Sequence, residues 1–95
     1  MKTRALKFSG VLVKERKGFS SLCLELDIAS CGKTIPQAKR MLLEAVTLYL
    51  ETAMESNLPY LRPVPPSENP ILTSPDLIAE TFNFSVNVQL IARAA

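Results

Sequence analysis

Two carboxylates in the first third of the chain, Glu25 and Asp27, have the residue type and alternate spacing that metal-dependent chemistry uses. On a strand they would share one face, and carboxylate oxygens hold the Mg²⁺ ions of many nucleases. Glu15 and Glu44 are further candidates, but no third acid stands at a diagnostic distance from the pair. The chain also contains no histidine to act as a general base. We therefore predict that the protein is not an enzyme and uses no metal and no cofactor.

The two cysteines, Cys23 and Cys31, lack the paired spacing of a zinc site, and no histidine is present to complete one. No histidine is available to activate either thiol as a nucleophile. Lysines interrupt the N-terminal apolar stretch, which argues against a signal peptide. No apolar run reaches the roughly eighteen residues of a membrane span. We expect reduced thiols in a cytoplasmic protein that does not cross a membrane.

The net charge of +2 conceals an asymmetry along the chain. Residues 1–17 carry six basic side chains and one acidic one, so the excess of negative charge lies in the remainder. A basic first hairpin can attract phosphate groups, whereas the simpler interpretation is that lysines protect a strand edge. RNA-binding proteins interleave aromatic side chains with basic ones, but only Phe8 and Phe19 lie in this region. Nucleic-acid binding is therefore the less favoured interpretation.

Alternating hydrophobicity predicts two strands joined by a tight turn in the first third of the chain. The first strand spans residues 4–15, and Gly10 near its centre suggests a bulge. Gly18 closes the turn, where it can take a positive φ. The return strand is expected over residues 19–28, with its leucines on the covered face. The opposite, wetter face would carry Ser21, Cys23, Glu25 and Asp27. Residues 29–32 are expected to form a short third strand.

A long helix is predicted from Ile35 to about Ser56. Thr34 is its candidate N-cap, and Gln37 three residues later completes a capping-box pattern. Gly32 lets the chain swing from the third strand into this helix. A stripe for packing on the sheet has three- and four-residue spacing: Ile35, Ala38, Leu42, Ala45, Val46, Tyr49 and Ala53. Further apolar residues widen the arc and indicate a second packing partner: Met41, Leu43, Leu48, Leu50 and Met54.

Six prolines between residues 59 and 75 predict an extended, partly polyproline-like connector over residues 57–75. At the end of the connector, we expect a single helical turn over residues 75–80, capped by Ser74. A terminal strand follows over residues 81–91 and can join its own sheet or that of a neighbour. The whole chain, residues 1–95, is predicted to be one α+β domain. Its expected architecture is two-layered, with three or four largely antiparallel strands and one long helix on one face, in the order β-β-β-α-β.

Several of these residues stand in an order that resembles the HicB-like antitoxins over residues 8–51. The matching positions are Gly18-Phe19, Leu24-Glu25-Leu26-Asp27-Ile28, Ser30, Gly32, Thr34, Ala38 and Glu44-Ala45. Pro36 and Gln37 depart from the family pattern. The resemblance implies a partial RNase H-like fold without a working nuclease site. Many members neutralise HicA, a small mRNA-degrading toxin, and many carry a C-terminal DNA-binding segment. Because only five residues follow Leu90, we expect that segment to be missing here.

The resemblance implies a non-catalytic, protein-binding module of a toxin-antitoxin system, with a HicA-like toxin as its possible partner. Such a toxin presents a basic RNA-binding surface, so its inhibitor should offer acids. We expect the partner-binding residues to combine acids with two apolar anchors: Glu25, Asp27, Met41, Glu44, Leu48, Glu51 and Glu55. Gly18, Gly32 and Thr34 are expected to serve the fold alone.

Two other functions remain open from the sequence. One is a solitary HicB-like protein that acts as a structural homo-oligomer, and the other is a nucleic-acid binder that uses the basic hairpin. A small core, a wide apolar arc on the helix and a terminal strand with two alternating faces predict at least a homodimer.

Overall fold

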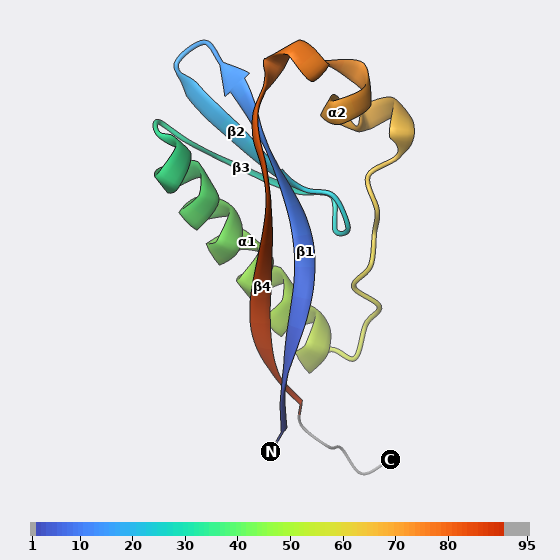
Figure 1. The fold of residues 1–95 in the computed structure, drawn as a ribbon. Coiled ribbons are helices and arrows are strands. Elements are labelled where there is room, and N and C mark those ends of the chain that lie inside the picture. Colours follow the sequence, from blue (N-terminus) through green and yellow to red (C-terminus); the bar gives the residue numbers. More distant parts are fainter. Residues whose placement is uncertain (1, 91–95) are drawn as a thin grey trace.

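A computed structural model describes the backbone of residues 2–90 and the side chains of residues 4–88. Four strands form one antiparallel sheet in the order β3-β2-β1-β4. Their bounds are β1 Lys2–Glu15, β2 Gly18–Cys23, β3 Ile28–Gly32 and β4 Ile78–Leu90. The helix α1, Ile35–Glu55, covers one face of the sheet, and the connector crosses the other side (Figure 1). The α+β class and the β-β-β-α-β order are therefore as predicted from the sequence.

The two long strands β1 and β4 run the length of the molecule, which measures 49 Å by 26 Å by 17 Å. The terminal strand pairs with β1 of its own chain, which answers the question that the sequence leaves open. The predicted strand over residues 81–91 begins earlier, at Ile78, and residue 91 lies outside the described residues. β2 pairs with β1 only from Gly10 onward, and β3 pairs with β2.

The return strand differs most from its prediction. β2 ends at Cys23, and residues 24–27 form a turn in which Asp27 has a φ of 53°. The face of β2 was also predicted wrongly, because Ser21 and Cys23 are buried whereas Leu22 is half-buried. Pairing with β1 explains this result: Cys23 lies opposite Gly10 and Ser21 opposite Leu12, and opposed residues point to the same face.

The core lies between this face and α1. It is built from the buried apolar side chains of the sheet and of the helix: Leu6, Phe8, Cys23, Leu26, Leu42, Val46, Leu50, Val86 and Val88. The helix stripe is centred on Leu42, Val46 and Leu50, so Leu50 belongs to the core rather than to the outer arc. Val11 is also fully buried, although it points to the opposite face, where α2 and the turn η2 contact β1.

The connector contains more regular structure than predicted. Three single turns interrupt it: η1 Pro66–Glu68, α2 Pro70–Thr73 and η2 Pro75–Leu77. Each turn begins at a proline, because the fixed φ of proline suits a first helical position where the missing N–H has no partner to lose. The expected Ser74 cap makes no side-chain hydrogen bond, and the last turn ends at Leu77 rather than at Glu80. The side chain of Asn69 instead caps α2, accepting from the Ile71 N–H over 3.0 Å.

Thr34 caps α1 as predicted. The Gln37 N–H donates to Thr34 Oγ1 over 3.2 Å, and Gln37 Oε1 accepts from the Lys33 N–H over 2.7 Å. We expect Thr34→Ala to lower the free energy of unfolding by about 1 kcal/mol. For a domain of this size that corresponds to a melting temperature about 4–8 °C lower. Thermal unfolding followed by circular dichroism measures the shift.

Thr52→Ala is the matched control, because it removes an exposed threonine hydroxyl from the same helix. Its Oγ1 donates only to the Leu48 carbonyl one turn back, a bond that does not cap the helix. The control should melt at or above the wild-type temperature, since alanine has the higher helix propensity. Equal melting temperatures for the two variants would contradict the capping role of Thr34.

Gly10 does not mark a bulge. Pairing is continuous there, with Phe82 opposite Gly10 on β4, and the register shift lies between Leu12 and Val13. The glycine instead makes room for an aromatic ring, because a Cβ at position 10 would lie 2.3 Å from Phe82 Cζ. The ring thus covers the glycine, as aromatic side chains do opposite strand glycines.

We expect Gly10→Ala to cost about 1–3 kcal/mol, because the added methyl group displaces the Phe82 ring. In a Phe82→Leu background the same substitution should cost at least about 1 kcal/mol less, because the obstacle has been removed. A double-mutant cycle measured by urea unfolding gives this coupling. Additive effects within about 0.3 kcal/mol would show that the ring is not what excludes a side chain at position 10.

Candidate partner-binding face

Five of the seven residues expected to bind a partner form one row on α1, which we call the outer stripe. The row consists of Met41, Glu44, Leu48, Glu51 and Glu55. The spacing alternates between three and four residues, so the side chains follow one another along the helix. All five are exposed. The structure therefore places these five residues together on one accessible face.

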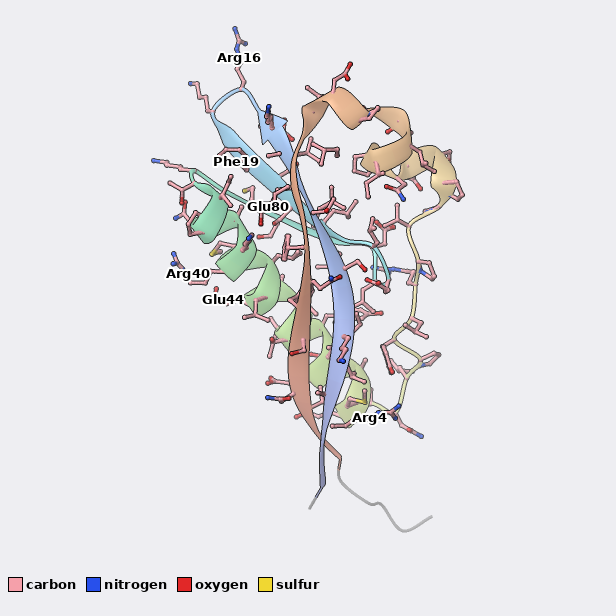
Figure 2. The ribbon with its side chains drawn as sticks, viewed as in Figure 1. Arg4, Arg16, Phe19, Arg40, Glu44 and Glu80 are labelled. Carbon is pink, nitrogen blue, oxygen red and sulfur yellow. The ribbon has the colours of Figure 1, made fainter. Side chains whose placement is uncertain are left out.

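The outer stripe faces solvent because the opposite side of α1 is committed to the sheet. Ala38, Leu42 and Val46 have no exposed surface, and they lie on the face of the helix that packs on the sheet, chiefly on β3 and β2. Glu44 and Arg40 project from the outer side of α1 (Figure 2). Among the described side chains, none forms an ion pair with the three carboxylates of the stripe. These charges are therefore available to a partner.

The stripe contains two exposed apolar side chains. Leu48 is 65% exposed and Met41 is 38% exposed, although both are large hydrophobic side chains. They lie seven residues apart, two helical turns along the same face. Leu48 stands at the centre of the row between Glu44 and Glu51, and Met41 stands at its N-terminal end. Protein-binding surfaces similarly combine apolar anchors with polar side chains around them.

The structure separates Glu25 and Asp27 from the outer stripe. Both residues lie in the turn between β2 and β3, and not on one strand face as predicted. The Glu25 carboxylate is turned inward, because Oε1 accepts from the Ser9 N–H over 2.8 Å. The Glu25 carbonyl accepts from the Arg62 N–H over 3.0 Å, which ties the turn to the connector. Glu25 thus completes the edge of β1 where β2 leaves it, whereas Asp27 is exposed.

Cys23 lies in the core, as its place on the helix-facing side of β2 requires. Burial, together with the nearby Glu25 carboxylate, raises the pKa of the Cys23 thiol to about 11. The Cys23 Sγ lies 3.8 Å from Glu25 Oε1. A protonated, buried thiol is a poor nucleophile and a poor metal ligand. Cys31 is the exposed thiol of the pair.

The basic residues of the N-terminal hairpin do not gather into one patch. Arg16 lies at the tip of the hairpin and Arg4 near the other end of the molecule (Figure 2). Lys14 and Lys17 accompany Arg16 at the tip, and all of these side chains are exposed. A phosphate backbone binds best to a continuous basic surface, so this arrangement disfavours the nucleic-acid interpretation.

Two kinds of site were not found in the described residues. No group of three or more Cys, Asp or Glu side chains in this part of the chain is placed to hold a metal ion. The described helices include none with the length and apolar character needed to cross a membrane.

Sequence patterns missed one feature beside the helix. Lys39 forms an ion pair with Glu80 and lies 5.0 Å above the Phe82 ring, which joins α1 to β4. Leu43, one turn further along the same side of α1 as Lys39, is 41% exposed. The residues are separated by about 40 positions in the sequence, so only the fold reveals the contact.

Comparisons with models of known protein families, with curated proteins and with solved structures returned no match to this chain.

Proposed function

We propose that the chain is a non-catalytic protein-binding module that acts as a HicB-like antitoxin and neutralises a HicA-like toxin. The observation that carries the proposal is the outer stripe, where Met41 and Leu48 are exposed in one row with three carboxylates that form no ion pair with the described side chains. The resemblance of residues 8–51 to HicB-like antitoxins supplies the class of partner.

The chemistry of the stripe suits a basic partner. Glu44, Glu51 and Glu55 would meet the cationic side chains with which such a toxin holds RNA. Long-range attraction of this kind mainly speeds and orients docking, whereas burial of Leu48 and Met41 supplies most of the affinity. By occupying the RNA-binding surface, the helix would exclude the message without any chemical step.

Co-expression tests this function directly. A small toxin-like protein encoded beside this chain should arrest growth alone, and this chain should restore growth and co-purify with it. If the neighbouring protein is toxic but neither rescue nor binding occurs, the antitoxin function is wrong. The solitary structural homo-oligomer, supported by the exposed apolar side chains, would then take its place.

A further inference from the structure

The outer edge of β4 is the longest unpaired backbone in the described sheet. β4 stands at the end of the strand order and pairs only with β1, along its other side. It runs for 13 residues, whereas β3 at the opposite end has five. An unpaired edge of this length displays a row of N–H and C=O groups that another strand can bind.

This edge lacks the features that usually protect a free strand. Residues 81–90 contain no charged residue and no proline. Glu80, the one charge on β4, is engaged by Lys39 of the same chain. The register shift lies near the start of the strand, so pairing from Glu80 onward is regular. A long edge without these features is open to pairing with a strand of another chain.

The two faces of β4 extend this argument to the side chains. Phe82 and Phe84 point toward the helix layer yet remain partly exposed, since no further strand lies beyond them. Leu43, one helical turn from Lys39 on α1, is a further exposed apolar side chain. The opposite face carries the exposed polar residues Asn83, Ser85 and Asn87.

We propose that two copies of the chain pair through their β4 edges, antiparallel, about a two-fold axis perpendicular to the sheet. Opposed residues of antiparallel strands point to the same face, so even-numbered residues must face even-numbered ones for the apolar row to continue. The two β4 strands pair over the greatest length when the two-fold axis passes at Phe84 or Ser85. The result is one eight-stranded sheet with both helices on the same face.

This pairing leaves the outer stripe free. Lys39 marks the side of α1 that faces β4, and Leu48 follows nine residues later, about 180° around the helix. The paired strands would be about 44 Å long. Two single strands bury a small area, near the lower limit for specific complexes, so we expect dissociation constants of the dimer in the micromolar range. Dimerisation and toxin binding can therefore occur together and fail separately.

Sedimentation velocity over a micromolar concentration series tests the proposal. The wild-type chain should be a dimer that dissociates on dilution. Ser85→Lys should weaken it by about fivefold or more, because the two lysines then lie close together at or beside the axis, on the same face of the sheet. Cys31→Lys places the same charge at an exposed position on the other edge strand, β3, and should have no effect.

A mixing experiment separates repulsion from misfolding. Ser85→Lys and Ser85→Glu should each be weakened alone, and an equal mixture should recover the dimer, because opposite charges then meet across the axis. Three results would overturn the proposal: a monomeric wild-type chain, weakening by Cys31→Lys in place of Ser85→Lys, or no recovery on mixing.

Discussion

Gly32→Val is expected to remove about 3 kcal/mol or more of folding stability, the largest loss among the substitutions considered for the fold. A Cβ at this position would lie 2.5 Å from the Ala38 nitrogen and 2.9 Å from the Ala38 Cα. These atoms belong to the backbone of the first turn of α1, so no side chain can move aside. The helix would have to lift from the end of β3, and the packing of Ala38 would be lost with it.

Urea unfolding measures this loss, with Ala29→Val as the matched control. Ala29 lies on the same strand, three residues earlier, and its side chain is exposed. Valine there should change stability by no more than about 0.5 kcal/mol, because the position is exposed and valine favours strands. An unfolding midpoint for Gly32→Val close to that of the control would mean that the first turn of α1 does not pack against Gly32.

The elements that were predicted well are those determined by neighbours in the sequence. The helix begins at Ile35 because Thr34 and Gln37 supply a local cap, and its 3.6-residue pattern continues to Glu55. Gly18, predicted for the turn, has a φ of 154°, and a Cβ there would also lie 2.5 Å from the Gly32 oxygen. That close approach joins residues 14 positions apart and was not visible in the sequence.

The predictions that failed concern features set by contacts between residues far apart in the sequence. The leucines of β2 suggested the covered face, but pairing with β1 places Cys23 and Ser21 there. Glu25 was expected on the surface, yet the amide of Ser9 holds its carboxylate inward. The outer stripe was accessible to prediction because a helix displays its periodicity within one segment. The β4 edge is different, since its exposure depends on the order of strands in the sheet.

Leu48→Asp should raise the dissociation constant of the proposed toxin complex at least about 100-fold, because it puts a charge where the proposal places an apolar anchor that is buried on binding. Leu48 is 65% exposed in the free chain, so the fold does not depend on it. The variant should therefore melt within about 2 °C of the wild-type temperature.

Leu72→Asp is the matched control for that substitution. Leu72 is also 65% exposed, but it lies on α2 in the connector, outside the outer stripe. The same change of size and charge at this position should leave binding within about twofold of the wild-type value. The comparison therefore separates a loss of the anchor from a general effect of added negative charge.

Calorimetric titration of the toxin-like protein encoded beside this chain into wild type, Leu48→Asp and Leu72→Asp tests the central claim most directly. Our account predicts tight binding for the wild type and for Leu72→Asp, with binding by Leu48→Asp at least about 100-fold weaker. Equal affinity of Leu48→Asp and the wild type would contradict it, because the outer stripe would then not be the surface that holds the toxin.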